Sequence, residues 1–328
     1  MRTVGVVIAA RNAEATIGPA VRSALASDHV TEVILVSDGS TDATAEMASS
    51  AAAGDARLYV LSLTRNVGPA EARNRAIAMA QADVLAVLDA DDRFLPGRLE
   101  PLIQRDDWDM VADNVVFVND PDYALPDSLV DPGRTASFQD LSLAGFAQGN
   151  LRRSGVARGE LGFLKPLISR EFLLRNHLQY DPGLRLGEDY DLYVRALMAG
   201  ARFLLTCRPG YLAQVRSDSL SSHHRTEDLE ALIRAMRVHV QAPGLTSEER
   251  SALRQGLAEM AGRHAHRAVL DVKGHRGLPG VVRTLLSRPG WIAPVLSGVL
   301  RDKLRPHHVE PVREGYRLLL GTEAMSPT

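Results

Sequence analysis

The first third of the chain alternates between short apolar runs and segments in which apolar residues recur at helical spacing. A run without polar interruptions is typical of a strand buried on both faces, so the runs predict strands and the segments between them predict helices. The predicted strands are residues 4–10, 32–36, 58–61 and 83–88, and the predicted helices are residues 15–26, 42–53 and 69–81. Strands that alternate with helices indicate an α/β fold with a mostly parallel central sheet and right-handed crossovers.

Three carboxylates in four positions follow the last of these strands: Asp89, Asp91 and Asp92. Their mutual repulsion is costly unless a cation or a ligand offsets it. Mg²⁺ and Mn²⁺ prefer oxygen ligands and commonly use one or two carboxylates together with the oxygens of a phosphorylated substrate. The cluster therefore predicts a metal site for a phosphorylated ligand. Asp92 by itself has a simple alternative role, because Asp is a favoured cap for the helix expected to begin near Pro96.

Other polar side chains are predicted at the same edge of the sheet. Arg11 and Asn12 follow the first strand, and Asp38 follows the second. Ligands of open α/β sheets collect at the carboxyl ends of the strands. The Gly-rich dinucleotide fingerprint and the P-loop are both absent from the sequence. We therefore expect a nucleotide whose base and ribose are hydrogen-bonded by polar side chains and whose diphosphate is held through a metal.

Composition narrows the class of protein. With 328 residues, of which 45% are hydrophobic and 24% charged, the chain can bury the core of one large domain or two smaller ones. The net charge of −2 gives no reason to expect a nucleic-acid partner. The single cysteine, Cys207, excludes an internal disulfide and fits a reducing compartment. Since the longest apolar stretch, residues 289–300, is well short of the ~20 residues of a membrane-spanning helix, we expect a cytoplasmic protein.

A second group of carboxylates, Glu188, Asp189 and Asp191, lies in the other half of the chain. Leu192 and Leu197 continue at helical spacing, which places the carboxylates in the first turn of a predicted helix. The N-terminus of a helix stabilises negative charge and so favours an ionised Asp at neutral pH. Taken alone, this pattern leaves two interpretations open: a carboxylate that accepts a proton in catalysis, or first-turn acids that only complement the helix dipole.

A series of motifs connects the two groups of carboxylates. It begins at Asn12 and ends at Glu188-Asp189. Between them stand Asp38-Gly39-Ser40-Thr41-Asp42, Asn66-Val67-Gly68, Ala72-Arg73-Asn74 and Asp89-Ala90-Asp91-Asp92. In their order and intervals, residues 1–225 resemble the GT-A glycosyltransferases of family 2. The segments that begin at Gly162 and Gly187 are similar to those of glucosyltransferases of succinoglycan-type exopolysaccharide assembly.

The resemblance implies a role for individual positions. Asp38 and Arg73 would contact the uracil of a UDP-sugar, and Asp89 would hold its ribose or sugar. Asp91 would ligate Mn²⁺ or Mg²⁺ at the diphosphate, and Asp189 would accept the proton of the acceptor hydroxyl in an inverting transfer. The positions implied in nucleotide-sugar binding are Ala10, Arg11, Asn12, Asp38, Asn66, Arg73, Asp89, Ala90 and Asp91. Arg11 departs from the family, which has an aromatic residue there, although a guanidinium can stack on a base as an aromatic ring does.

Further residues are implied in contacts with the diphosphate or the acceptor: Lys165, Glu188, Arg216, His223 and His224. The last three follow the predicted helix at the interval at which related enzymes close a basic residue or His over the diphosphate. A solvated polar loop is the alternative for either histidine, and Lys165 could simply extend to solvent. The Gln-x-x-Arg-Trp signature of processive relatives is absent, which favours the addition of a single sugar.

The composition changes at about residue 226, where the sequence predicts a helical C-terminal region that extends to residue 328. Residues 273–308 hold seven Lys or Arg against the single acidic residue Asp302, together with Trp291 and several apolar residues. A segment of this kind can lie in a membrane interface. It can equally be a helical extension packed on the catalytic domain or on a second subunit, and the oligomeric state is left open.

These patterns predict a GT-A catalytic domain at residues 1–225, with a nucleotide-sugar half up to about 118 and an acceptor half at 119–225, followed by the helical region. The resemblance implies transfer of one sugar, with glucose as the expected sugar, from a UDP-sugar to a carbohydrate or lipid-linked oligosaccharide in exopolysaccharide synthesis. Membrane contact would place this reaction at the inner face of the cytoplasmic membrane. Two alternatives are a nucleotidyltransferase, which would release pyrophosphate, and a non-catalytic sugar-nucleotide-binding protein.

Overall fold

The structure is a computed structural model that describes residues 2–120, 123–130, 136–151, 161–215, 225–304 and 315–320. The chain divides into two compact units, which we describe separately. The first contains residues 1–216 and 312–328, and the second contains residues 217–311. The end of the chain therefore differs from the prediction, because its last described segment belongs to the first unit and not to the helical region.

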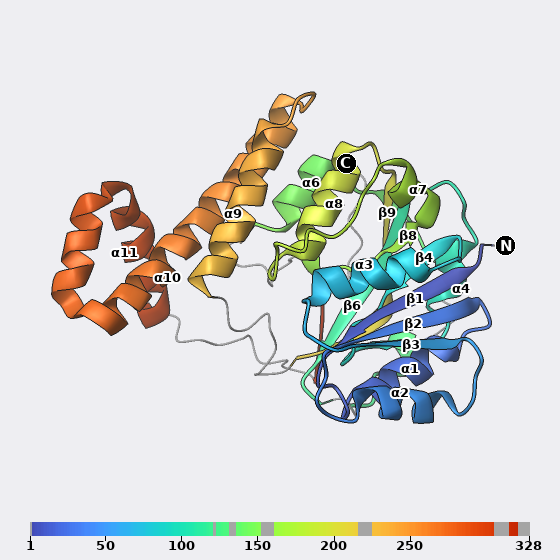
Figure 1. The fold of residues 1–328 in the computed structure, drawn as a ribbon. Helices are drawn as coiled ribbons and strands as arrows, with labels where there is room; N and C mark the ends of the chain where they lie inside the picture. Colours follow the sequence, from blue (N-terminus) through green and yellow to red (C-terminus); the bar gives the residue numbers. More distant parts are fainter. Residues whose placement is uncertain are drawn as a thin grey trace. The chain divides into compact units, whose positions relative to one another are not determined.

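One sheet organises the first unit (Figure 1). Its N-terminal half has the order β3-β2-β1-β4, and all three pairings are parallel. The strands are β1 (Val4–Ala10), β2 (Val30–Asp38), β3 (Leu58–Leu63) and β4 (Val84–Val87). Each lies at an apolar run of the sequence, and β3, at the edge of the sheet, is the most exposed of the four. The predicted parallel sheet is confirmed for this half.

Three helices cover this half of the sheet. Helices α1 (Ile17–Leu25) and α2 (Thr44–Ala52) pack together on one face, and α3 (Pro69–Met79) packs on β1 and β2 from the other (Figure 1). Right-handed crossovers explain this arrangement, because the chain moves outward from β1 to β3 and then returns across the sheet to β4. The direction of strand order therefore reverses between β1 and β4.

The second half of the unit adds shorter elements and makes the sheet mixed. Strand β8 pairs antiparallel with β4 and β6, whereas β6 pairs parallel with β9. The predicted helix near Pro96 begins later, as α4 at Leu99. The elements are β5 (Arg93–Phe94), α4 (Leu99–Ile103), β6 (Met110–Val118), α5 (Asp127–Val130), β7 (Gln139–Asp140), α6 (Leu143–Gly149), η1 (Leu161–Phe163), β8 (Leu167–Ser169), α7 (Arg170–Arg175), α8 (Glu188–Met198) and β9 (Phe203–Gln214).

Aromatic side chains hold α8, the helix that carries the second group of carboxylates. Phe146 of α6 stacks on Tyr190, with ring centroids 5.6 Å apart, and meets Tyr193 edge-on at 6.0 Å. Tyr193 also meets Phe203 of β9 edge-on at 6.3 Å. Because Phe146, Tyr193 and Phe203 are all buried, α8 is held in position over the sheet by packed rings.

A strand near the end of the chain, β10 (Tyr316–Leu318), completes the sheet by pairing antiparallel with β6. Asn114 of β6 fixes the next residues, because its side-chain amide donates to the carbonyl of Leu320 at 2.9 Å and accepts from the N–H of Leu320 at 2.8 Å. The second unit is therefore an insertion between β9 and β10, two strands that both belong to the sheet of the first unit.

The second unit is helical, as predicted. It contains α9 (Thr226–Gln241), α10 (Ser247–Ser287), η2 (Pro289–Trp291) and α11 (Ile292–Leu304). Helix α10 begins at a capping box formed by Thr246 and Glu249. The backbone of α10 breaks at Gly277, where φ is 61°. Among the described residues, no helix is long and apolar enough to cross a membrane.

Candidate active site

The reversal of strand order between β1 and β4 marks the position of the site, because ligands of open α/β sheets bind outside the carboxyl ends of the strands at such a point. Asn12 follows β1, Asp38 ends β2, and Asp89 follows β4. The structure thus brings to one edge of the sheet the polar residues that the sequence predicted there.

Asp38 binds the loop that precedes α3. Its two carboxylate oxygens accept hydrogen bonds from the backbone N–H groups of Val67 at 2.7 Å and Gly68 at 2.9 Å. Asn66 accepts a further bond from Gly68 at 2.8 Å. Gly39 is required beside this loop, because its φ is +61° and a Cβ atom would lie 2.5 Å from the backbone nitrogen of Asn66. Asp38 therefore shapes the loop through its anionic oxygens, and its contact with a base stays a prediction.

Asn12 joins the end of β1 to the turn after β2. Its side-chain oxygen accepts from the N–H of Thr41 at 2.9 Å, and its own N–H donates to the hydroxyl of Ser40 at 3.2 Å. Arg11, beside it, is exposed at the same edge, while Ala10 lies buried at the end of β1. Asn12 therefore has a structural role in the turn, whether or not it contacts a nucleotide.

Asp92 has a position different from that of the other two carboxylates of its cluster. It is buried, and it accepts hydrogen bonds from the hydroxyl of Tyr211 at 2.7 Å and the N–H of Gln214 at 2.9 Å. Burial raises the pKa of Asp92, and the nearby carboxylates of Asp89 and Asp91 raise it further. Asp92 thus fixes the loop after β4 to strand β9.

The helix-cap alternative for Asp92 is wrong. Helix α4 begins at Leu99, its N-cap is Arg98, and no side chain caps it by a hydrogen bond. The capping preference of Asp predicted a local contact for Asp92. Its buried carboxyl instead accepts hydrogen bonds from Tyr211 and Gln214, which lie more than a hundred residues away in the sequence.

Asp89 is held by two cations. One oxygen lies 2.8 Å from Nη2 of Arg73, and the other lies 2.9 Å from Nζ of Lys165. Burial alone would raise the pKa of Asp89, but Lys165 and Arg73 outweigh this effect and lower the pKa. The side chain of Asp89 is 30% exposed, so its carboxylate is partly accessible to a ligand. Arg73 and Lys165 compensate the negative charge of this carboxylate.

Arg73 and Lys165 also bind the carboxylates at the start of α8. Nη1 of Arg73 lies 2.8 Å from Oε1 of Glu188 and 3.7 Å from Oδ1 of Asp189. Nζ of Lys165 lies 2.7 Å from Oδ2 of Asp189. These five side chains form one network, which we call the charge network, and its three carboxylates and two cations leave one excess negative charge.

Both cations of the charge network are buried, and burial by itself disfavours their charged forms. The carboxylates reverse this effect. Asp189 and Asp89 raise the pKa of Lys165, and together with Glu188 they raise the pKa of Arg73. Lys165 therefore stays protonated at neutral pH, and the network contains fixed positive charges between the two groups of acids. The contacts of Arg73 are with carboxylates, and the base contact that the resemblance implied for it stays a prediction.

One carboxylate oxygen of Asp189 accepts no hydrogen bond. Oδ2 accepts from Lys165, whereas Oδ1 is buried and has no hydrogen-bond partner. A buried acceptor without a hydrogen bond is costly and calls for a functional explanation. Its neighbours in the first turn are engaged differently, since Asp191 accepts from Arg195 at 2.8 Å. The structure thus separates Asp189 from the other first-turn acids.

The loop that carries Lys165 is fixed on two sides. Arg98 donates to the carbonyl of Lys165 at 2.6 Å and is itself bound to Asp113 at 2.8 Å, and all three residues are buried. Tyr193 of α8 donates to the carbonyl of Leu164 at 3.0 Å. The alternative that Lys165 extends to solvent is wrong, because its side chain is only 8% exposed and its ammonium lies between Asp89 and Asp189.

Sequence reasoning missed the function of Asn74, although its motif was recognised. The side chain of Asn74 donates to the carbonyl of Tyr180 at 2.8 Å and accepts from the N–H of Tyr180 at 2.9 Å. The ring of Tyr180 then lies 5.3 Å from the guanidinium carbon of Arg73. Asn74 therefore fixes the segment before α8, so two adjacent residues of α3 serve the same network.

A metal at this site would depend on the ligand as well as on the protein. Among the residues that the structure describes, no group of three or more His, Cys, Asp or Glu is arranged to hold a metal ion. Asp91 is partly exposed directly after β4 and can supply one carboxylate. This fits Mg²⁺ or Mn²⁺ whose other ligands are diphosphate oxygens and water. Arg216, His223 and His224 lie outside the described residues.

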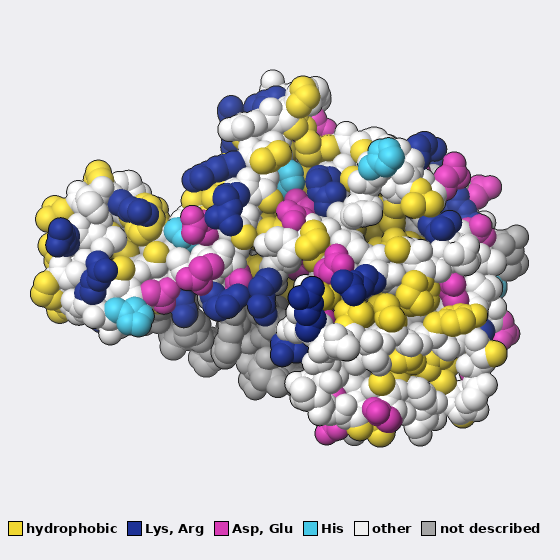
Figure 2. Space-filling model, in the orientation of Figure 1, with side chains coloured by type: hydrophobic (Ala, Val, Ile, Leu, Met, Phe, Trp, Pro, Cys, Tyr) yellow, Lys and Arg dark blue, Asp and Glu magenta, His cyan; other side chains and the backbone are white. Residues whose placement is uncertain are grey.

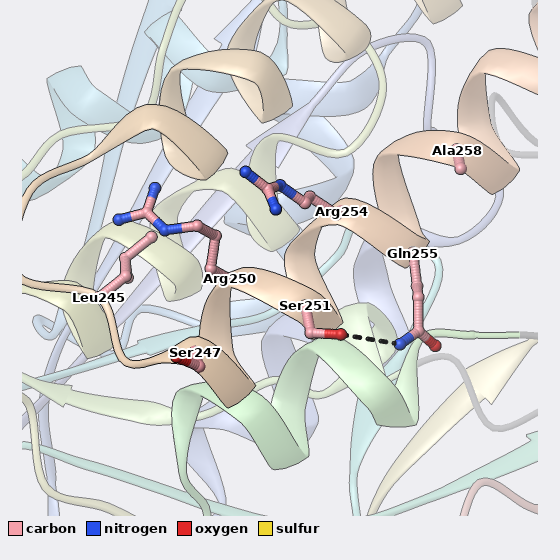
Figure 3. Close-up of a pocket in the computed structure, with 7 residues that line it drawn as sticks. All are labelled: Leu245, Ser247, Arg250, Ser251, Arg254, Gln255 and Ala258. Carbon is pink, nitrogen blue, oxygen red and sulfur yellow. Dashed lines mark hydrogen bonds between the residues drawn. The ribbon is translucent and has the colours of Figure 1, made fainter.

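A shallow hollow of about 400 Å³ lies on α10 in the second unit (Figure 3). Arg250 and Arg254 line it, but Arg250 donates to the carbonyls of Val240 and Ala242, and Ser251 pairs with Gln255. The hollow shares no residue with the charge network. It contains no carboxylate and no histidine among its lining residues, so it does not compete as the candidate active site.

Comparisons with known proteins agree with this site. The family description "Glycosyl transferase family 2" matches residues 5–148. The chain is 44% identical over 299 residues to the succinoglycan biosynthesis protein ExoU of Rhizobium meliloti (strain 1021). The matched region covers 91% of this chain and 87% of ExoU. The chain is also 33% identical over 292 residues to the succinoglycan biosynthesis protein ExoO of the same strain, with 86% and 81% of the two chains covered.

Solved structures show the same fold. TarS of S. aureus, residues 1-349 in complex with UDP-GlcNAc, matches with a TM-score of 0.62 and 20% identity, over 91% of this chain and 81% of that one. The same protein in complex with UDP matches with a TM-score of 0.61 and 18% identity. At these identities the likeness concerns the fold alone.

Proposed function

The chain belongs to glycosyltransferase family 2 and has a GT-A-like fold, and from this premise we propose that it transfers one sugar from a UDP-sugar to a carbohydrate or lipid-linked oligosaccharide acceptor. We further propose that it acts in exopolysaccharide synthesis in the cytoplasm, with glucose as the transferred sugar. The relatives support the setting, since two of them are named for succinoglycan biosynthesis. The observation that carries the proposed chemistry is Asp189, a buried carboxylate with one oxygen on Lys165 and the other without a hydrogen bond.

Asp189 is the proposed general base. The acceptor hydroxyl attacks the anomeric carbon of the donor sugar from the face opposite the diphosphate, the bond from that carbon to the diphosphate breaks, and UDP leaves with its electron pair. The hydroxyl proton passes to Asp189, and the anomeric configuration inverts. Because Oδ1 is buried, the hydroxyl can reach it only when neighbouring side chains move as substrates bind. Proton acceptance by a positioned carboxylate contributes about 10²–10⁴-fold to a rate.

Lys165 is the proposed positioning residue for this base. Its ammonium holds Oδ2 of Asp189, so the carboxylate is kept oriented with Oδ1 free of hydrogen bonds and 3.7 Å from Nη1 of Arg73. The same ammonium holds Asp89, the residue proposed to bind the ribose or sugar of the donor. One cation thus fixes the distance between the donor and acceptor sides of the reaction. We also propose a direct contact of Lys165 with the acceptor, which these ion pairs neither support nor oppose.

Asp91 is the proposed ligand of a divalent cation at the donor diphosphate. When bound, such a cation supplies counter-charge to the departing UDP. Asp38, Asn66 and Arg11 are proposed to line the side of the uridine, where Asp38 already orders the loop at Val67 and Gly68. Oxygen ligands from one carboxylate and the diphosphate suit either Mg²⁺ or Mn²⁺.

The Asp91→Asn variant tests the metal assignment. We expect UDP binding that is strengthened by Mn²⁺ in the wild type and insensitive to Mn²⁺ in the variant, as measured by titration calorimetry with and without the ion. The fold should be retained, because removing one anion relieves repulsion within the cluster. Equal Mn²⁺ enhancement in both proteins would exclude Asp91 as the ligand.

The reaction itself is tested by its products. The wild type, incubated with a panel of UDP- and GDP-sugars, should show thermal stabilisation by the true donor, because a ligand that binds only the folded state raises its stability. With acceptor present, that donor should yield UDP. Release of pyrophosphate would instead indicate nucleotidyl transfer, and donor binding without turnover or slow hydrolysis would indicate a non-catalytic binding protein.

A further inference from the structure

The end of α10 and helix α11 carry apolar side chains on two sides. On the inner side, Ala265, Val269 and Val295 are buried, and Val281, Leu285 and Trp291 pack against them. Close backbone approach supports this packing, because a Cβ atom on Gly298 of α11 would lie 2.6 Å from the ring of His266. The inner side therefore accounts for how these two helices hold together.

The outer side has no such explanation. Leu278, Val282 and Leu286 recur every four residues after the break at Gly277 and are 68%, 56% and 75% exposed. On α11, Leu296 and Leu300 are 61% and 58% exposed at the same spacing. Single exposed leucines are ordinary, but regularly spaced apolar side chains on adjoining helices mark a surface that binds something.

The charged residues within this stretch of the sequence have one sign. Lys273, Arg276, Arg283 and Arg288 are all exposed, and the sequence has no Asp or Glu from 272 to 301. Figure 2 shows dark-blue and yellow side chains together over α11 and the adjoining end of α10. The guanidinium of Arg288 also lies 4.4 Å from the ring of Trp291, a pair that combines a cation with an amphipathic aromatic ring.

We propose that this surface, formed by the exposed side chains of residues 273–300 and called the basic surface, docks the protein on an anionic lipid bilayer. Apolar side chains at helical spacing flanked by Lys and Arg are the pattern of helices that lie in the plane of a membrane interface. Headgroup phosphates complement the cations, and the acyl boundary takes up the leucines and valines. A second copy of the chain fits less well, because a two-fold interface would set the same cations against one another.

Liposome co-sedimentation of the full chain without UDP-sugar tests the proposal, so its result does not depend on the proposed transfer reaction. The vesicles are phosphatidylcholine alone and an equal mixture of phosphatidylcholine and phosphatidylglycerol. We expect binding to the anionic vesicles that falls strongly between 0.1 and 1 M salt, over which the Debye length shortens from about 10 to 3 Å. Arg283→Glu/Arg288→Glu should lower the partition coefficient by about 30-fold or more, at the usual contribution of each cation.

A second pair of variants tests the apolar part of the surface. Leu278→Ser/Leu286→Ser should lower the partition coefficient by about tenfold or more. Val238→Ser on α9 is the matched control, because Val238 is 68% exposed but lies outside the segment. Arg234→Glu/Arg254→Glu is the control for the change in charge, since it alters the net charge of the chain by the same amount. Both controls should bind like the wild type.

Several outcomes would overturn the proposal. Equal pelleting with neutral and anionic vesicles, equal loss in the matched controls, or no pelleting at all would each exclude docking through this surface. Light scattering distinguishes lipid docking from an interface between two copies of the chain. If the wild type were a dimer that Leu278→Ser/Leu286→Ser converted to a monomer, without lipid binding by either, the surface would be an interface between copies. Unfolding midpoints equal to that of the wild type show that each variant is folded.

Discussion

The charge network of the first unit and the basic surface of the second are built from the same kinds of side chain in opposite arrangements. Around Asp189 every cation has carboxylate partners within 3 Å, and the side chains of Arg73 and Lys165 are only 6% and 8% exposed. At the end of α10 the cations are exposed beside exposed leucines, in a stretch without acids.

The difference matches the two kinds of ligand that we propose. Buried, paired charges lose hydration and must be held in fixed geometry, which suits a small ligand whose reacting atoms need accurate placement. Exposed charges of one sign interact with the average field of a large partner and are weakened by salt. A conservative side-chain substitution should therefore change activity strongly in the charge network, whereas a substitution on the basic surface should change it little.

The largest effect is expected for Asp189→Asn, which removes the proposed proton acceptor and keeps the shape of the side chain. Turnover should fall by about 10² or more, while the affinity for the UDP-sugar stays close to that of the wild type. Initial rates at saturating donor and calorimetry with UDP measure the two quantities. Glu71→Gln, at a half-buried acid of α3 that pairs with Arg75 outside the charge network, is the matched control and should leave both unchanged. Normal turnover with weakened donor binding would show that the roles are wrongly assigned.

Lys165→Met should destabilise the protein and slow the reaction. Removing one partner of a buried ion pair costs about 3–5 kcal/mol, because the remaining charges lose their compensation. In the wild type the pKa of Asp89 is lowered, so its stabilising contribution is present above the ordinary carboxyl pKa of about 3.9 and is lost as the pH falls below it. In Lys165→Met only Arg73 still opposes the effect of burial, so we expect the pKa of Asp89 to rise. The loss of stability relative to the wild type should then be smaller at acid pH than at neutral pH.

Thermal unfolding from pH 4.5 to pH 8 measures this difference. The gap between wild type and Lys165→Met should widen as the pH rises from acid to neutral, since the carboxylates become charged without their cation. Lys165→Arg is the informative control, because it restores the charge with a different shape. It should recover most of the stability and less of the turnover. A gap that is constant with pH would show that Lys165 acts through packing alone.

The sequence predicted the parallel half of the sheet because its evidence is local. Apolar runs identify β1, β2 and β4, and both groups of carboxylates were recognised from their motifs. Strand β10 could not be predicted in this way, since three residues pair with β6 about two hundred positions away. No local pattern distinguishes such a strand from a tail.

The charge network shows the same limit at the level of side chains. Arg73 was assigned to the base of the nucleotide, and the structure gives it three carboxylate partners that are separated from it in sequence. Lys165 stands in a loop without periodicity, so its importance depends wholly on Asp89 and Asp189. Sequence patterns placed the acids and both cations in the site, whereas the pairing of the cations with the acids became clear only from distances.

A moderate effect is expected for Asp38→Ala on donor binding. Its carboxylate accepts two backbone hydrogen bonds in the loop of Val67 and Gly68, and loss of such buried bonds costs about 1–3 kcal/mol. We expect the KM for the UDP-sugar to rise about tenfold with little change in kcat. Asp55→Ala, in the turn at the opposite end of β3, is the control and should leave the KM unchanged. A lower kcat at normal KM would instead place Asp38 in the chemical step.

The smallest effect is expected for Arg283→Glu/Arg288→Glu when a water-soluble acceptor is used. Because Asp189, Lys165 and Arg73 receive their hydrogen bonds and ion pairs within the first unit, reversing two exposed charges of the second unit should leave kcat and KM within about twofold, as is usual for surface substitutions. With the acceptor embedded in anionic vesicles, the same variant should lose activity, and high salt should produce the same loss in the wild type. Steady-state rates with the two acceptors separate the regions. A large loss with the soluble acceptor would show that the basic surface and the charge network act as one site, and would end the distinction between them.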